Sequence, residues 1–161
     1  MIIAIEGITI CFILLLVLVI GMAYDGPVGM VCFYEKDVQD RVVELKLTTK
    51  ERIRKATIIS GLAVTLPLII LVPYMVYGIN GAVGFKEGFV QMLLIGMIGN
   101  LFDRLFIDWY WVGKTNAWNI PGTEDLKPYI PKTTLIKKWF GTLMAMPLLY
   151  ALIAWLMTVM K

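Results

Sequence analysis

The chain has 161 residues, of which 59% are hydrophobic, and its formal net charge is only +3. This composition is more apolar than that of soluble domains, and the charge is too small to predict a nucleic-acid partner. Histidine is absent, which excludes Ser-His-Asp and Cys-His catalysis, His-ligated haem and the ordinary zinc sites. We therefore predict no metal or cofactor, and any chemistry must use carboxylates, lysine, arginine, tyrosine, serine, threonine or asparagine.

Four long apolar segments dominate the chain, at residues 2–24, 56–77, 89–107 and 140–160. Each is about 19–23 residues long, close to the 20 or so that a helix needs to cross a hydrocarbon core of about 30 Å. Strand-like alternation is absent, and lipid admits only helices and closed barrels. The sequence therefore predicts an all-α polytopic membrane protein with a single four-helix transmembrane domain over residues 1–161.

The first predicted span contains one charged residue, Glu6. No basic leader precedes it, and it is longer than the apolar core of a signal peptide, so we expect it to be retained. Cys11 lies within this span and Cys32 just beyond it. We expect both to be free, buried thiols.

The connection between the first two spans is predicted to be partly helical. Residues 38–47 form an amphipathic turn or two, and Thr48-x-x-Glu51 is a possible capping box for a helix that leads into the second span. The basic residues within 50–55 are expected to lie at the anionic inner leaflet. They serve either as a membrane anchor or as a specific head-group site.

Prolines and glycines punctuate the later spans. Pro67 and Pro73 in the second span and Pro147 in the fourth are expected to kink their helices. Asn80-Gly81 predicts a tight hairpin between the second and third spans.

Lysine and arginine are distributed unevenly among the connections. Twelve of them lie in the two long connections, whereas only Lys86 lies between the second and third spans and only Lys161 follows the fourth. Cytoplasmic loops retain Lys and Arg. The protein is therefore predicted in the cell membrane, with both long loops cytosolic and both termini outside.

The stretch from 96 to 125 is the one that suggests chemistry. At about 100° per residue, Asn100, Asp103, Arg104 and Asp108 share one face of a helix that also carries Trp111, and Arg104 can reach Asp108 at the i,i+4 spacing. A charge facing lipid costs at least about 2–3 kcal/mol on insertion scales. Asp103 and Arg104 must therefore face the bundle or pair, either as a structural latch or as a functional polar site.

Aromatic residues and a turn follow this face. Their expected role is the aromatic belt at the inner interface, with stacking on a ligand as the alternative; they are Trp109, Tyr110, Trp111 and Trp118. The turn at 119–123 is expected to bring Glu124 and Asp125 back toward Asp103. Together they would bound a polar pocket that is open on the cytosolic side, with Asn100, Arg104, Asp108, Trp111 and Glu124 as binding residues.

Residues 99–104, Gly-Asn-Leu-Phe-Asp-Arg, resemble the Gly-Asn-x-x-Asp-Arg motif of lipoprotein signal peptidase, a four-span family that carries the motif on its third span. The resemblance implies an aspartyl-protease pair, with Asp103 as its first member and Asp125 as the nearest candidate for the second. The match covers six residues, and Asn119-Ile120-Pro121-Gly122 has no aspartate at the place of that family's second motif. The region 102–125 also looks like small bacterial four-span membrane proteins of uncharacterised activity.

Three functions remain open. The first is a small membrane protein of undetermined activity, whose polar site lies at the cytosolic interface and whose partners are lipids, another membrane protein or a second copy. The second is an interfacial enzyme acting on a lipid or lipid-anchored substrate, by aspartyl-protease-like or other acid/base chemistry. The third is a transporter or channel subunit, which would need oligomers because the other spans have few polar residues. Those residues are Glu6, Thr9, Thr57, Ser60, Thr65 and Thr142.

Overall fold

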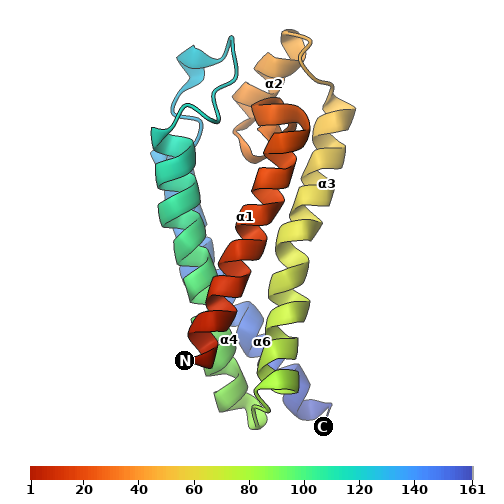
Figure 1. Ribbon diagram of the computed structural model, residues 1–161, viewed down its shortest axis with the longest axis vertical. Helices are drawn as coiled ribbons and strands as arrows, with labels where there is room; N and C mark the ends of the chain where they lie inside the picture. Colours follow the sequence, from red (N-terminus) through yellow and green to blue (C-terminus); the bar gives the residue numbers. More distant parts are fainter. Residues whose placement is uncertain (161) are drawn as a thin grey trace.

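Four long helical rods run side by side along the molecule (Figure 1). The computed structural model describes residues 1–160, which contain no strand. All four rods are long and apolar enough to cross a membrane, and they confirm the predicted all-α, four-span architecture. Their bounds are Ile2–Gly29, Lys50–Ile79, Gly84–Val112 and Lys132–Val159.

Three of the rods change their helical type along their length. Their α-helical parts are α3 (Lys50–Leu66), α4 (Gly84–Phe102), α5 (Lys132–Phe140) and α6 (Met146–Val159), whereas the first rod is α1 (Ile2–Gly29), which has no π-helical turn but a kink at Asp25 and Gly26. Wider π-helical turns occupy Pro67–Leu71, Tyr74–Ile79, Asp103–Val112 and Gly141–Ala145. The connections hold α2 (Lys36–Glu44) and the short 3-10 helices Val31–Phe33 and Glu124–Leu126.

Prolines adjoin three of the four π-helical turns. Pro67 begins one, Pro73 directly precedes the next and Pro147 follows the third by two residues. A proline lacks the N–H and crowds the carbonyl four residues before it, so the hydrogen-bond ladder beside it moves to wider spacing. The turn at Asp103–Val112 has no proline, and it is the one that carries the charged residues.

The rods extend beyond the apolar segments that predict them. Hydropathy marks the part of a helix that suits lipid, whereas helical hydrogen bonds continue through charged turns such as residues 50–55 and 132–138. The second rod does begin near the predicted cap, but Thr49 is the N-cap instead of Thr48. Its hydroxyl accepts a hydrogen bond from the backbone N–H of Arg52 at 3.3 Å.

The third rod is central, with α4 packed against both α1 and α6. Glycines permit this close approach. A Cβ on Gly96 would lie 2.4 Å from the ring of Tyr150 on α6, and one on Gly99 would lie 2.8 Å from Ile10 on α1. Membrane helices associate through such small residues because apolar contact with a neighbouring helix is no better than contact with lipid.

Two apolar clusters fill the bundle. One lies toward the end that holds both termini and the other toward the end that holds the two long connections. The first comprises Ile10, Leu14, Val72, Met75, Val76, Tyr77, Ala82, Met92, Ile95, Tyr150 and Ala154. The second comprises Leu18, Met30, Val31, Tyr34, Val38, Val42, Ile53, Ile107, Trp118, Ile120 and Tyr129.

The two long connections pack on each other at one end of the bundle. The amphipathic helix predicted at 38–47 is α2, which buries Val38 and Val42. The Tyr34 hydroxyl donates to the Trp118 carbonyl at 2.7 Å. At the surface, Arg41 and Asp125 form an ion pair at 3.2 Å. The connections therefore form one cap, not two separate loops.

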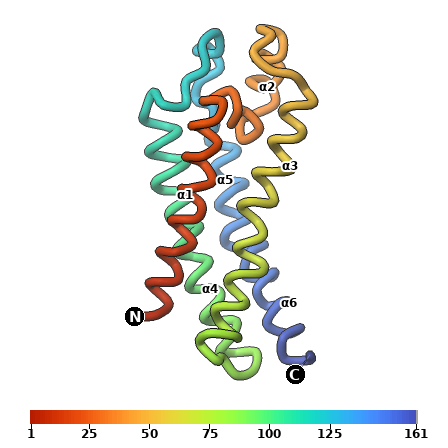
Figure 2. Tube along the Cα trace, turned by 45° about the vertical axis from the view of Figure 1, so that its right-hand side comes forward, coloured from red at the N-terminus to blue at the C-terminus, as the bar shows by residue number. Residues whose placement is uncertain are grey.

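The opposite end holds the N-terminus, the C-terminal end of α6 and the hairpin between the second and third rods (Figures 1 and 2). Gly81 in this hairpin has a φ of +68°, a conformation that favours glycine. The predicted Asn80-Gly81 turn is thus confirmed. The arrangement is compatible with a multi-pass membrane protein.

Candidate functional site

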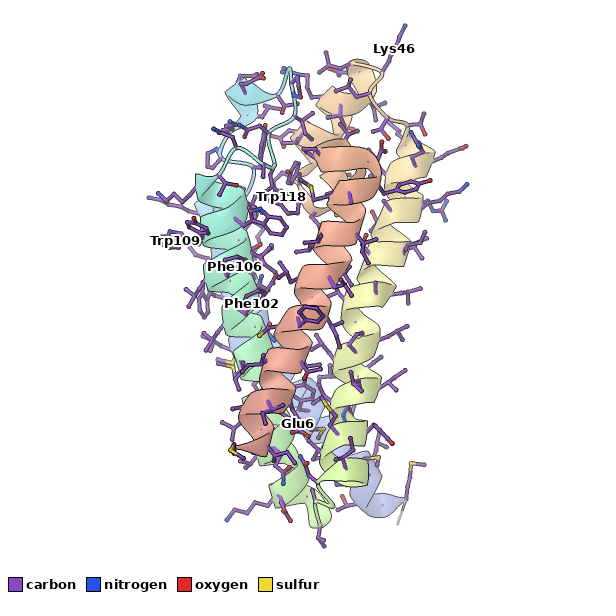
Figure 3. The ribbon with its side chains drawn as sticks, in the orientation of Figure 1. Glu6, Lys46, Phe102, Phe106, Trp109 and Trp118 are labelled. Atoms are coloured by element: carbon purple, nitrogen blue, oxygen red, sulfur yellow. The ribbon has the colours of Figure 1, made fainter. Side chains whose placement is uncertain are left out.

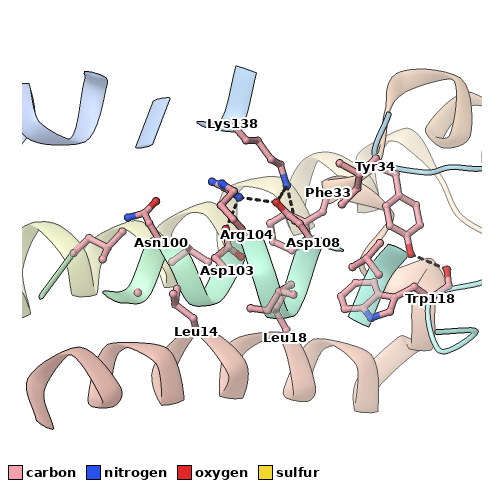
Figure 4. A pocket seen from close by; sticks show the side chains of 16 residues that line it. Leu14, Leu18, Phe33, Tyr34, Asn100, Asp103, Arg104, Asp108, Trp118 and Lys138 are labelled. Carbon is pink, nitrogen blue, oxygen red and sulfur yellow. Dashed lines mark hydrogen bonds and ion pairs between the residues drawn. The ribbon is translucent and has the colours of Figure 1, made fainter. Parts of the chain in front are cut away.

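A charge cluster lies inside the bundle between the two apolar clusters. It comprises Asp103, Arg104 and Asp108 from the third rod and Lys138 from the fourth (Figure 4). In the close-up, Lys138 approaches from one side, whereas Leu14 and Leu18 of α1 approach from the other.

Arg104 joins the two carboxylates. Its Nη1 atom donates to Asp103 Oδ2 at 2.6 Å and to Asp108 Oδ2 at 2.7 Å, so the predicted i,i+4 pair forms. Lys138 Nζ contacts both oxygens of Asp108, at 2.8 and 2.9 Å. Asp108 is only 5% exposed and is fully committed to these cations. Two carboxylates thus face two cations, and a buried group of charges with no net charge is the arrangement that a membrane interior tolerates best.

Asp103 differs from Asp108 in having capacity to spare. Its side chain is 31% exposed, and only one of its carboxylate oxygens is bonded within residues 1–160. Beside it, Arg104 Nε is buried and has no hydrogen-bond partner in the described part of the chain. Buried polar groups are normally satisfied, so the open acceptor of Asp103 and the orphaned donor of Arg104 are two polar groups for which the described residues supply no partner.

Asn100 is held by its own helix and by the fourth rod. Its Nδ2 donates to the Gly96 carbonyl at 2.9 Å and contacts Met146 Sδ at 2.9 Å, and its Oδ1 accepts from Thr142 at 3.0 Å. These hydrogen bonds occupy both polar atoms of the Asn100 side chain. Asn100 therefore positions the third rod against the fourth.

The charge cluster forms one wall of a cavity of about 320 Å³. Ligand pockets begin at about this size. Among the residues that line it, Asp103, Lys138 and Phe33 are each about a third exposed. Most other walls are apolar, and the lining residues are Leu14, Leu18, Phe33, Tyr34, Val64, Leu68, Gly99, Asn100, Asp103, Arg104, Ile107, Asp108, Val112, Trp118, Ile130 and Lys138.

Three residues of the predicted pocket are not among those that line the cavity. Trp111 packs edge-on against Trp118, with ring centroids 5.1 Å apart. A π-helical turn advances by less than 100° per residue. A helical wheel that starts at Asn100 and assumes about 100° per residue therefore assigns Trp111 to the cavity face, which is not the face on which it lies. Glu124 accepts from the backbone N–H of Gly122 at 2.9 Å. Asp125 is 61% exposed and pairs with Arg41.

Other residues line the cavity where the sequence predicts Glu124 and Asp125. The loop contributes Trp118 and Ile130 to the cavity, and α5 contributes Lys138. Lys138 lies in a basic run before the fourth apolar segment. Its charge is the only property in the sequence that points to a place in the cluster.

The aromatic residues divide between the surface and the core. Trp109 and Tyr110 are 58% and 50% exposed on the outside of the third rod, as expected of an interfacial belt, and Figure 3 shows Trp109 pointing outward. Trp118 is only 1% exposed. It is therefore part of the cap and not of the belt.

Burial changes the acidity of two groups in the first connection. Burial raises the pKa of Tyr34 well above its ordinary value, with a further increase from Tyr129. Burial likewise raises the pKa of the Cys32 thiol. Tyr34 therefore remains neutral beside the cavity, and Cys32 has little of the thiolate that a nucleophile needs.

A second buried acid, Glu6, lies at the opposite end of the bundle and is only 6% exposed. Asn80 Nδ2 donates to Glu6 Oε2 and to Gln91 Oε1, both at 3.0 Å. The first apolar cluster lies between this network and the charge cluster, and its members Ile10 and Met92 have no exposed surface. The two polar groups are therefore separate.

Comparison with protein-family models, with curated proteins and with solved structures found no match to this chain. The function is therefore inferred from the geometry of the cavity and its charge cluster.

Proposed function

We propose that this protein binds the polar group of a membrane amphiphile in the cavity beside Asp103. One observation carries the proposal: Asp103 and Arg104 both line a cavity whose other walls are mainly apolar, and each retains a polar atom, Asp103 Oδ1 and Arg104 Nε, with no hydrogen-bond partner within residues 1–160. A small polar metabolite would leave those walls unused, and a pure hydrocarbon would not compensate the two polar groups. An amphiphile matches both features.

The balance of charge within the cluster favours a ligand that has no net charge. The cluster already has two carboxylates and two cations, so a ligand with a net charge would be left uncompensated in surroundings of low dielectric. A zwitterionic head group bears both a donor for Asp103 and an acceptor for Arg104. Phosphatidylethanolamine has this chemistry, because its ammonium donates hydrogen bonds and its phosphate accepts them.

The distribution of positive charge supports a cytosolic position for this site. Residues of both long connections, among them Tyr34 and Trp118, line the cavity, and twelve lysines and arginines belong to those connections in the sequence. Positive residues are retained in the cytosol. The amphiphile would accordingly be drawn from the inner leaflet.

An interfacial enzyme that uses Asp103 as a single acid or base is the second candidate. The open oxygen of Asp103 favours it, since that atom can reach a proton on a bound ligand. A pair of the aspartyl-protease kind has less support. Asp125, the predicted second member, pairs with Arg41 at the surface and does not line the cavity, and Arg104 lies between Asp103 and Asp108, so these two carboxylates do not share a hydrogen bond with each other.

A test compares phosphatidylethanolamine with phosphatidylcholine, whose head group has no N–H. Wild-type protein in nanodiscs of both lipids is expected to retain phosphatidylethanolamine in native mass spectrometry. Asp103→Asn should weaken that retention by about tenfold, the value of one charge-assisted hydrogen bond. A new lipid-derived mass that requires Asp103 would establish turnover.

Asp125→Asn is the matched control, because it removes the same charge from the exposed cap. It should retain the lipid as wild type does. The proposal fails if Asp103→Asn is folded, as judged by circular dichroism and yield, and still prefers phosphatidylethanolamine to the wild-type extent.

A further inference from the structure

A second and larger hollow, of about 610 Å³, lies between α1 and α3 near the cap. Its lining includes Ile20, Tyr24 and Ile59, whose side chains are 59%, 88% and 67% exposed. It is therefore a groove on the outer surface of the bundle, where lipid surrounds a membrane protein. None of the charge cluster lines it.

Small residues form the floor of this groove. Ala56, Ser60 and Ala63 follow one another at the i, i+4, i+7 spacing of a single helix face, and Gly21 lies opposite on α1. From Arg52 to Ala63 a helix rises about 16 Å, which is about the depth of one leaflet of a 30 Å hydrocarbon core. The groove thus has the length of one acyl chain.

The end of the groove nearest the cap is charged. Arg52 and Lys55 line it together with Asp25. The Arg52 side chain is 62% exposed, and its Nη1 lies 3.9 Å from Asp25 Oδ2, the outer limit for an ion pair. Lys55 is exposed and forms no ion pair within residues 1–160. Two cations and one carboxylate leave this rim with a net positive charge.

The backbone of α1 shapes the rim. Asp25 and Gly26 both leave the helical conformation, so the helix is interrupted at these two residues, and Gly26 has a φ of +59° and a ψ of −156°. Only glycine adopts this conformation readily. The interruption lets residues 27–31 turn back, and Val28, Met30 and Val31 close the end of the groove.

We propose that the groove is a binding site for an anionic phospholipid. The phosphate lies between Arg52 and Lys55, and one acyl chain follows Ala56, Ser60 and Ala63 toward the middle of the bilayer. Basic pockets between transmembrane helices bind acidic head groups in this way. A second copy of the chain suits the groove less well, since a two-fold interface would bring two sets of Arg52 and Lys55 together.

The test uses nanodiscs of equimolar phosphatidylglycerol and phosphatidylcholine, with retained lipid measured by native mass spectrometry. Wild-type protein is expected to retain phosphatidylglycerol in preference. Arg52→Gln with Lys55→Gln should reduce that preference about 30-fold, the combined effect of two cations near a membrane surface. Asp25→Asn should raise it, because the competing carboxylate is removed.

The matched control is Lys50→Gln with Arg54→Gln, which removes the same charge from the same helix outside the groove. It should keep the wild-type preference. A second pair tests the acyl chain: Ala63→Trp fills the groove and should release the lipid, whereas the neighbouring Leu62→Trp, outside the groove, should not.

Three outcomes would overturn the proposal. They are an equal loss in both charge variants, unchanged retention in Arg52→Gln with Lys55→Gln, and a lipid-free dimer that Ala63→Trp dissociates. Lipid binding at the Asp103 cavity is measured separately, because the groove variants should not change the preference of that cavity for phosphatidylethanolamine.

Discussion

At the scale of single residues, two neighbouring carboxylates have different roles. Asp108 is buried and bound by both cations, so its main contribution is to hold the third and fourth rods together. Asp103 lines the cavity and keeps one oxygen without a hydrogen-bond partner within residues 1–160. The difference depends on Lys138, which reaches only Asp108.

Asp108→Asn is therefore expected to destabilise the protein far more than Asp103→Asn. Breaking a buried ion pair costs about 3–5 kcal/mol, because Lys138 would keep its charge without its carboxylate partner. Thermal unfolding in detergent, followed by circular dichroism, measures the effect. Asp125→Asn serves as the surface reference, at about 0–1 kcal/mol. Equal melting temperatures for the Asp108 and Asp125 variants would show that the cluster does not stabilise the bundle.

At the scale of elements, the bundle depends on how closely α4 approaches its neighbours. Gly96 meets the Tyr150 ring, and that tyrosine is only 1% exposed, so its ring has little room to move. Close packing of this kind replaces the hydrophobic effect as the source of helix association in lipid.

Gly96→Leu should accordingly separate α4 from α6 and destabilise the protein by about 1–3 kcal/mol, the usual range for overpacking. Gly61→Leu is the control, because a Cβ at Gly61 meets nothing within 4 Å. Unfolding by a denaturing detergent would compare the two. If both variants unfold together with wild type, the contact between α4 and α6 is looser than the structure indicates.

The elements also show which features a sequence can predict. Hydropathy and length identify the four spans, and the i,i+4 spacing identifies the Arg104–Asp108 pair, because both are local properties. Lys138 binds Asp108 of that pair although it lies 30 residues later in the chain. Arg41, which lies 84 residues before Asp125, binds the Asp125 carboxylate at the surface, so Asp125 does not reach the predicted pocket. Such partners are chosen by tertiary packing. The register of Trp111 could not be predicted either, since it depends on a π-helical turn without a proline.

At the scale of the whole molecule, the two ends differ in character. The cap joins both long connections, whereas the opposite end is a short hairpin beside the chain ends. The predicted orientation, with the cap in the cytosol, can be tested by labelling introduced cysteines with a membrane-impermeant maleimide.

In a background that lacks Cys11 and Cys32, Val83→Cys should be labelled in intact cells, because Val83 is 75% exposed in the hairpin. Lys46→Cys, in the first connection, should be labelled only after the cells are permeabilised. Labelling of position 46 alone in intact cells would place the cap and the cavity outside.

The hydrogen bond from Tyr34 to the Trp118 carbonyl has a consequence for biosynthesis. Its two residues are 84 positions apart, and translation adds about 5–20 residues per second. For about 4–17 s after Tyr34 is added, therefore, the nascent chain has no Trp118 carbonyl to accept this hydrogen bond. Tyr34, which is 5% exposed in the folded protein, shares its apolar cluster with Trp118, Ile120 and Tyr129, so this cluster is completed only when the later connection has been made.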